Sequence, residues 1–295
     1  MSNDRFDGFH IRKIYHTKDG GEEWFMDHEN EDVLEDDERV KNWRDDDGNN
    51  KVGLRSLGKN KWEAKGTSDK KQHRLEVWSP KEGNEDEQQR SRWLNVEITA
   101  YCRVDDTSGN PPYAWQLYCR GGSHRNNHRC EGSALKARWR RRNNKVHVIK
   151  EICHGAYTEP EAEERDRRVE KFGGGKWYGA KLIVYNVEEN GSTHTKQEVW
   201  VDETTGSGDA KNSWEMVTDY VDNGGWEVEE TEHEEDDDFK RHCRDNNNCD
   251  RRRDEILTKP GGRNNRNCVA LRTDKITIHF KHLSCREIDP GRPIS

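Results

Sequence analysis

Charged and titratable side chains gather around one predicted turn of the chain. The stretch YAWQLYCRGGSHRNNHRCEGSALKARWRRR, residues 113–142, reads as a strand, a glycine turn, a loop between two cysteines and a second strand. Arg120, His124, Glu131 and Lys136 surround this turn. Arginine and lysine pair with carboxylates, and histidine exchanges a proton near neutral pH. We therefore expect the turn to face an anionic ligand at one end of a groove.

Polar and aromatic side chains also occupy one phase of several predicted strands. In a half-buried strand alternate residues face the core. The residues in the opposite phase are Arg74, Glu76, Trp78, Glu97, Tyr101, Gln116, Tyr118, Arg120, Lys181, Tyr185, Glu198 and Trp200. This mixture favours a groove, because sugar rings stack on aromatic faces and uronate carboxylates pair with cations. The alternative is a solvated face held by cross-strand ion pairs, such as Arg74 with Glu76 and Glu97 with Lys181.

The elements that must position these residues are almost all predicted strands. Period-two alternation runs through HRLEVWSP, WLNVEITAYCRV, YAWQLYCR, KVHVIKEICH, WYGAKLIVYNV, KQEVWVDE and ITIHFKHLSCREI. The stretch LRSLGKNKWEAKG has turn chemistry at residues 58–60, and helical periodicity is good only over residues 159–172. Many strands with turn signals and little helix predict an all-β fold, a sandwich or jelly roll.

We expect one jelly-roll domain over residues 1–295. Residues 1–50 form an acidic N-terminal segment within it, with eleven acids against three bases between positions 27 and 47. Residues 227–253 form a second acidic insertion, which we expect Cys243 and Cys249 to staple.

Composition limits the class of protein. Only 29% of the residues are hydrophobic and 37% are charged, yet eleven tryptophans argue for a folded core. The net charge is −8, and no nucleic-acid motif accompanies the basic tract at residues 136–145. No stretch is long and apolar enough for a transmembrane helix. No signal peptide is apparent, so a secreted protein would be a mature form.

Eight cysteines without a C-x-x-C pair favour disulfides and an oxidising compartment over a structural zinc site. Cys102 and Cys119 lie in the core phase of their strands, and buried thiols are the alternative reading. Asn190-Gly191-Ser192 is a glycosylation sequon. These features predict an extracellular or cell-surface location.

Several motifs together resemble concanavalin-like jelly rolls. WLNVEITAYCRV resembles the strand that leads into their curved sheet, and KWYGAKLIVYNVEENG with QEVWVDE resembles their later hairpin. ITIHFKHLSCREI looks like their closing strand. The central part, YCRGGSH to KEICHGAY, is similar to uncharacterised extracellular jelly-roll proteins of microbes. The resemblance covers roughly residues 52–226 and 254–288 and implies this fold.

Polysaccharide lyases of the alginate and glucuronan type share this architecture. The chain resembles them in Arg74-Leu75-Glu76, Gln116, His124 or His154, and Tyr185-Asn186, but lacks their Gln-Ile-His triplet. The resemblance implies an eliminative reaction. Arg120 or Gln116 would neutralise the uronate carboxylate, His124 or His154 would remove the C5 proton, and Tyr185 would protonate the leaving oxygen. The substrate-binding residues would be Arg74, Glu76, Trp78, Tyr118, Lys136, Lys181 and Trp200.

Two other kinds of site fit the sequence less well. Jelly-roll glycosidases carry acids in an E-x-D-x-x-E pattern, and Glu198, Asp202 and Glu203 have the wrong spacing. DDDGNN, residues 45–50, resembles part of a calcium loop, although a simple turn explains it as well. We expect no cofactor and no metal, with calcium as the open alternative.

The predicted function is extracellular binding of an anionic, uronate polysaccharide, with eliminative cleavage left open. The alternative is a non-enzymatic surface or matrix protein. We expect neither a nucleic-acid partner nor a membrane span. The alternating acidic and basic tracts leave head-to-tail self-association open.

Overall fold

The computed structural model describes residues 4–44, 53–65, 72–79, 93–104, 113–121, 134–140, 145–153, 156–158, 175–205, 207–222, 267–274 and 276–294. Within them the chain forms two antiparallel sheets and one short helix, α1 (Glu31–Asp36). The predicted all-β jelly-roll sandwich is confirmed. The division into a single domain 1–295 with an acidic segment 1–50 stays a prediction, and the insertion 227–253 lies outside the described residues.

The larger sheet has nine strands, in the order β14-β13-β12-β7-β16-β5-β4, with β1 and β2 paired to β16. Their bounds are β1 (Tyr15–Thr17), β2 (Glu23–Phe25), β4 (Leu54–Gly58), β5 (Lys61–Lys65), β7 (Val96–Arg103), β12 (Trp177–Glu189), β13 (Ser192–Glu203), β14 (Glu215–Asp222) and β16 (Thr277–Pro293).

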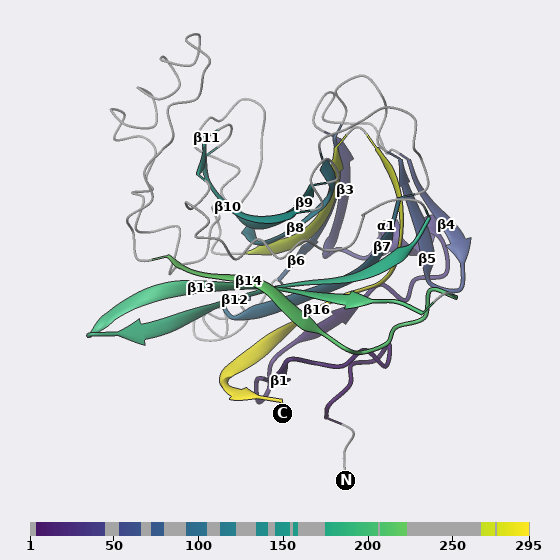
Figure 1. Cartoon of the computed structure of the whole chain (residues 1–295). Helices are drawn as coiled ribbons and strands as arrows, with labels where there is room; N and C mark the ends of the chain where they lie inside the picture. The colour runs from purple at the N-terminus through teal and green to yellow at the C-terminus, as the bar shows by residue number, and fades with distance from the viewer. Residues whose placement is uncertain are drawn as a thin grey trace.

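The smaller sheet has seven strands, in the order β11-β10-β9-β8-β15-β6-β3. Their bounds are β3 (Val40–Arg44), β6 (Gln72–Trp78), β8 (Tyr113–Gly121), β9 (Ala134–Arg140), β10 (Lys145–Cys153), β11 (Ala156–Thr158) and β15 (Cys268–Asp274). In Figure 1 this sheet lies above the nine-stranded one, and its end strands β11 and β3 stand higher than its middle strands.

The core lies between the two sheets because period-two alternation sends every second side chain inward. Leu75 and Val77 of β6 and Leu117 of β8 meet Ile98 of β7 and Leu182 of β12 in one buried cluster. The predicted core phases of β6 and β7 are confirmed. Two stacked rings, Trp115 and Trp139, with centroids 5.8 Å apart, are buried in the same cluster.

Turn chemistry fixes two hairpins of the larger sheet, β4–β5 and β12–β13. Lys59 and Asn60 have φ of 51° and 59° between β4 and β5, and Asn190 and Gly191 have φ of 51° and 78° between β12 and β13. Two successive residues with positive φ are what a two-residue hairpin turn requires. Both turns were expected from their sequences. The expected helix over residues 159–172 lies outside the described residues, whereas α1 was not expected.

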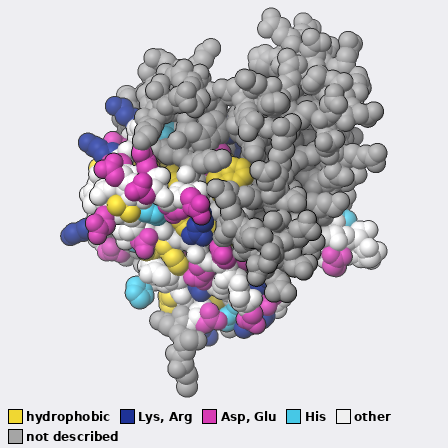
Figure 2. Space-filling view, turned by 180° about the vertical axis from the view of Figure 1, so that it is seen from behind, with side chains coloured by type: hydrophobic (Ala, Val, Ile, Leu, Met, Phe, Trp, Pro, Cys, Tyr) yellow, Lys and Arg dark blue, Asp and Glu magenta, His cyan; other side chains and the backbone are white. Residues whose placement is uncertain are grey.

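The described surface carries mixed charge, as the composition requires. In Figure 2 acidic and basic side chains are interspersed, with apolar side chains scattered among them. Val33, Leu57 and Met216 are the large hydrophobic side chains that are exposed among the described residues. They lie on three different elements, α1, β4 and β14.

Candidate functional site

The predicted site residues fall on two opposite faces of the sandwich. One group lies on the outer face of the seven-stranded sheet and comprises Arg74, Glu76, Trp78, Gln116, Tyr118 and Lys136. Their neighbours along each strand, such as Leu75, Leu117 and Leu135, are buried between the sheets. By the same alternation Lys181, Tyr185 and Trp200 lie on the outer face of the nine-stranded sheet. The expected single groove lined by both groups is therefore wrong, because the core separates them.

The first face carries a row of basic side chains that runs across five strands. Strand register places Arg272 of β15 opposite both Arg74 of β6 and Gln116 of β8. Arg138 of β9 lies opposite Gln116, and His147 of β10 lies opposite Arg138. We call Arg74, Arg272, Gln116 and Arg138, continued by His147, the arginine row. With neighbouring strands about 4.8 Å apart, it spans roughly 19 Å.

A second layer of side chains lies beside the arginine row on the same face. Glu76 accepts hydrogen bonds from the Tyr118 hydroxyl at 3.0 Å and from Trp78 Nε1 at 3.2 Å. Lys136 of β9 forms an ion pair with Glu151 of β10, and its Nζ lies 5.5 Å from the centre of the Tyr118 ring. These contacts fix the aromatic rings and the lysine next to the arginines.

Sequence reasoning missed Arg138, His147, Glu151 and Arg272. The signal for Arg138 was present, because it has the same phase as Lys136 in ALKARWR. Arg272 lies in CVALRTD, which was not among the predicted strands. More than 40 residues separate this segment from Asp222, the last residue of the preceding described strand, β14. Only the register of the folded sheet brings Arg272 beside Arg74.

The face has more positive than negative charge. Among the residues whose side chains the structure describes, Arg74, Arg138, Arg140, Arg272, Lys136 and Lys145 provide six cations on this face, and Glu76 and Glu151 provide two anions. Burial lowers the pKa of Lys136 to about 7, with Arg272 and Arg74 contributing and Glu151 opposing. Burial works against ionisation of Glu151, but Lys136 and Arg74 outweigh it and hold the pKa of that carboxyl below its usual value.

Very little of this face is exposed. The exposed fractions are 3% for Arg74, 2% for Arg272, 1% for Lys136 and 9% for Arg138. Cations removed from water have a strong preference for an anionic or hydrogen-bonding partner. Their burial strengthens any interaction that an anion makes with them.

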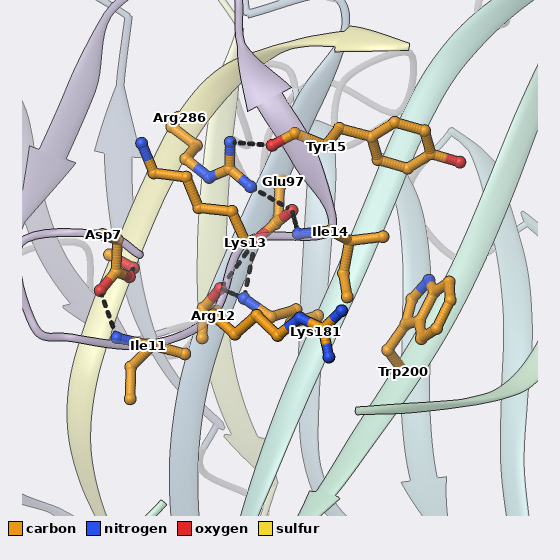
Figure 3. A network of polar contacts seen from close by, with 12 residues as sticks. Asp7, Ile11, Arg12, Lys13, Ile14, Tyr15, Glu97, Lys181, Trp200 and Arg286 are labelled. Atoms are coloured by element: carbon orange, nitrogen blue, oxygen red, sulfur yellow. Dashed lines mark hydrogen bonds and ion pairs between the residues drawn. The ribbon is translucent and has the colours of Figure 1, made fainter. Parts of the chain in front are cut away.

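The second group of predicted residues is held by contacts within the protein. Glu97 of β7 accepts from Lys181 Nζ at 2.7 Å and from Arg286 Nη2 at 2.6 Å (Figure 3). Ile14 donates its backbone N–H to Glu97 at 3.4 Å. Burial opposes ionisation of Glu97, but Arg286 and Lys181 outweigh it and lower its pKa to about 2. Lys181 is therefore part of a structural network under the N-terminal segment.

Tyr185 and Trp200 have a similar environment. The Tyr185 hydroxyl donates to Glu198 at 2.7 Å, and Trp200 Nε1 donates to the same carboxylate at 3.1 Å. Tyr15 of β1 donates to Glu198 at 2.9 Å. Burial raises the pKa of Tyr185 well above its ordinary value. A partnership of Tyr185 with Gln116 in one reaction would need them side by side, whereas they lie on opposite faces.

Arg120 does not line the same surface as Gln116 and Tyr118, contrary to expectation. Its φ is 52°, which breaks the alternation at the end of β8. Its guanidinium donates to Thr195 Oγ1 at 2.9 Å and Asn186 Oδ1 at 2.8 Å, both in the nine-stranded sheet. Arg120 therefore ties one sheet to the other. His124 and His154 lie outside the described residues.

The disulfide prediction receives no support from four of the eight cysteines, Cys102, Cys119, Cys268 and Cys285, which are buried thiols. Cys102, Cys119 and Cys285 are buried thiols within the core. Burial raises the pKa of each of them. Cys130, Cys243 and Cys249 lie outside the described residues. An oxidising compartment therefore receives no support from the thiols in the core.

In the part of the chain that the structure describes, no three His, Cys, Asp or Glu side chains come together as ligands for a metal ion. The Asp- and Asn-rich stretch considered for calcium, residues 45–50, lies outside that part. Among the described residues no helix has the length and apolar character needed to cross a membrane.

Comparisons with known proteins bear on architecture alone. No protein-family model and no curated protein matches the sequence. Solved structures similar to this chain include peanut lectin with a nine-residue peptide, with 7% identity, coverage of 90% of this chain and 96% of the lectin, and a TM-score of 0.43. The exoplasmic/lumenal domain of VIP36 in its Ca²⁺/Man-bound form has 7% identity, 85% and 84% coverage, and a TM-score of 0.43. Carbohydrate-binding module CBM66 from Bacillus subtilis has 13% identity, 76% and 93% coverage, and a TM-score of 0.36. At these TM-scores the similarity carries no argument about function, which must be argued from the side chains.

Proposed function

We propose that the outer face of the seven-stranded sheet binds an anionic polysaccharide, with uronate carboxylates on the arginine row. The observation that carries this proposal is the direct cross-strand juxtaposition of Arg74 and Arg272, with Gln116 and Arg138 continuing the row. A ligand with negative charge is attracted to this concentration of cations, and guanidinium groups pair with carboxylates through two parallel hydrogen bonds.

The neighbouring side chains favour a sugar over a small inorganic anion. The rings of Trp78 and Tyr118 lie beside the arginines in a separate apolar cluster with Ala134, Cys268 and Ala270. Aromatic rings provide flat apolar surface for pyranose rings. Gln116 can both donate and accept, as hydroxyl groups require. A row of roughly 19 Å suits an extended chain with several charges.

The low exposure of the row sets a condition on binding. With Arg74, Arg272 and Lys136 no more than 3% exposed, a polymer reaches them only if this face opens. We therefore expect binding to be slow compared with diffusion-limited association.

The direct experiment is calorimetric titration of the full-length protein with polyuronates, namely alginate, polygalacturonate and hyaluronan. Dextran of matched length is the uncharged control. The proposal expects saturable binding of at least one polyuronate that weakens as salt is added, and no binding of dextran. Failure of every polyuronate to bind at low salt would contradict it and leave the non-enzymatic structural role.

Eliminative cleavage is a second candidate, and the pKa of Lys136 near 7 favours it. Burial and the two arginines lower the pKa of Lys136 from its ordinary value towards neutrality, which makes the neutral amine more accessible for proton abstraction. Neutral Lys136 would take the C5 proton, a double bond would form between C4 and C5, and the C4–O bond would break with proton donation to the leaving oxygen. Tyr118, whose ring centre lies 5.5 Å from Lys136 Nζ, carries a hydroxyl on this face for that donation, and His124 and His154 keep their predicted roles as alternatives for the base.

Cleavage is tested by the absorbance of the unsaturated product. Lyase activity that is present in the wild type and absent in Lys136→Gln would support Lys136 as the base. Binding without any unsaturated product would restrict the function to binding.

We also propose an extracellular location, because uronate polysaccharides long enough to span the arginine row are polymers of the extracellular matrix. The sequon at Asn190 is exposed at the tip of the β12–β13 hairpin, as an acceptor site must be.

A further inference from the structure

We propose that Glu151 accepts a hydrogen bond from a sugar hydroxyl of the bound polymer, through a carboxylate oxygen that has no donor in the described part of the chain. This inference rests on the proposed function, since it concerns which ligands the same face selects. The observation behind it is a difference between the two described carboxylates of this face.

Glu76 has hydrogen bonds from the sheet on both of its carboxylate oxygens. Its Oε1 accepts from the Tyr118 hydroxyl at 3.0 Å, and its Oε2 accepts from Trp78 Nε1 at 3.2 Å. The protein itself therefore satisfies and orients this carboxylate.

Glu151 differs, because only one of its oxygens is in use. Oε2 forms the ion pair with Lys136 Nζ. Oε1 is buried and has no hydrogen-bond partner among the described residues. The side chain is only 1% exposed, and a buried acceptor without a donor is costly, the more so when it is charged. Oε1 is therefore suited to a donor that a ligand brings.

Glu151 faces outward with the arginine row and lies within electrostatic reach of it. It shares the phase of His147 along β10. Burial opposes its ionisation, but Lys136, Arg74 and Arg272 together lower the pKa of the carboxyl. Cations have this effect only when they lie close to the carboxylate. A polymer held on the arginine row would consequently pass near Glu151.

Charge decides which part of such a polymer can meet Glu151. The carboxylates of the polymer are attracted to the arginines and repelled by Glu151, whereas a hydroxyl can donate to Oε1. A hydrogen bond to an ionised acceptor is stronger than one between neutral groups. A polyanion without hydroxyls would gain the arginine contacts alone and leave Oε1 without a donor. Glu151 thus selects a hydroxylated chain over a plain polyanion.

The uronate ring has its hydroxyls in the right place for this contact. In alginate, polygalacturonate and hyaluronan, each uronate unit keeps free hydroxyls at C2 and C3. These atoms lie across the ring from C5, which carries the carboxylate. One sugar unit can therefore give its carboxylate to the arginine row and a hydroxyl to Glu151.

The experiment is calorimetric titration of the full-length protein with oligouronates prepared from the polyuronate that binds most tightly. Two analogues lack the C2 or the C3 hydroxyl on every uronate unit, so they keep the charge and add no bulk. The wild type should bind at least one analogue about tenfold or more weakly than the parent oligouronate. In Glu151→Met this ratio of affinities should fall close to one. Glu287→Gln, which removes a carboxylate that is 5% exposed on β16, is the control and should keep the wild-type ratio.

A double variant covers the case in which Glu151→Met does not fold because Lys136 has lost its anion. Lys136→Met/Glu151→Met replaces the whole ion pair by apolar side chains, which folded proteins often tolerate, and should also give a ratio close to one. Equal affinity of the wild type for the parent and both analogues would overturn the inference, as would a wild-type ratio in either variant. The proposed function would stand in both cases. Absence of binding to every polyuronate would overturn both.

Discussion

Arg74 on β6 and Arg272 on β15 lie directly opposite each other on the outer face of the seven-stranded sheet, with exposed fractions of 3% and 2%. Two like charges in this position destabilise the sheet by up to about 1 kcal/mol. Removing each from water adds a further cost. Burial makes any interaction of these guanidinium groups with an anion stronger than it would be in water.

Glu97 should make the stability of the protein depend on acid pH. Lys181 and Arg286 outweigh burial and lower its pKa from 4.5 to about 2, so the folded state gains stability that is fully present above pH 4.5. That contribution, about 3 kcal/mol, should be lost as the pH falls from 4.5 towards 2. Urea unfolding of the wild type and Glu97→Gln at pH 6 and pH 3 measures it.

The difference in unfolding free energy between wild type and Glu97→Gln should shrink as the pH falls. Glu189→Gln, an exposed position on β12, is the matched control and should show no such change. A constant difference between pH 6 and pH 3 would contradict the account of Glu97.

Arg120 should contribute to stability and not to ligand binding. Its guanidinium donates to Leu94 O, Thr195 Oγ1 and Asn186 Oδ1 and so joins the two sheets. Loss of these bonds in Arg120→Ala should cost about 3 kcal/mol and lower the melting temperature. Affinity for polyuronates should remain that of the wild type at a temperature where the variant is folded. A loss of affinity without a loss of stability would return Arg120 to the binding site.

The buried thiols should react only after unfolding. Cys102, Cys119 and Cys285 lie in the core, and burial raises the pKa of each, which disfavours the reactive thiolate. Alkylation without reductant should label none of the three in native protein and all three in denaturant, as peptide mass spectrometry would report. Peptides in which these cysteines stay unlabelled in denaturant would indicate disulfides.

The turn at Asn190 should accept a glycan if the protein passes through a secretory pathway. Asn190, Gly191 and Ser192 are all exposed at the tip of a long hairpin. Expression in a secreting eukaryotic cell should give a mass increase that an N-glycosidase removes and that Asn190→Gln lacks. A secreted product with unmodified Asn190 would contradict this expectation.

Local pattern predicted most of the fold and about half of the candidate site. Period-two alternation placed Arg74, Glu76 and Gln116 opposite the core correctly, because it depends only on neighbours in the same strand. It could not tell which sheet a strand joins, so Lys181 and Tyr185 were assigned to the wrong face. The row itself depends on register between distant strands, and Arg272 therefore escaped prediction. One residue with positive φ, Arg120, was enough to reverse the expected direction of a side chain.

The cysteines show a second limit of reading the sequence alone. An even count is compatible with disulfides and equally with thiols that pack as small apolar side chains. The core phase of Cys102 and Cys119 was read correctly, but it indicated burial and not pairing. Only the position of each sulfur atom in the folded core distinguishes a disulfide from a buried thiol.

The central claim is tested most directly by the affinity of Arg272→Gln for a polyuronate, measured together with its unfolding free energy. Loss of a buried charge contact should reduce affinity by roughly 30-fold or more, corresponding to at least about 2 kcal/mol. The unfolding free energy is measured in parallel, so that a loss of affinity can be separated from a loss of folded protein. Arg55→Gln, whose side chain is 63% exposed on the other sheet, is the control and should bind like the wild type. Wild-type affinity in Arg272→Gln, for every polyuronate that binds the parent, would contradict the account.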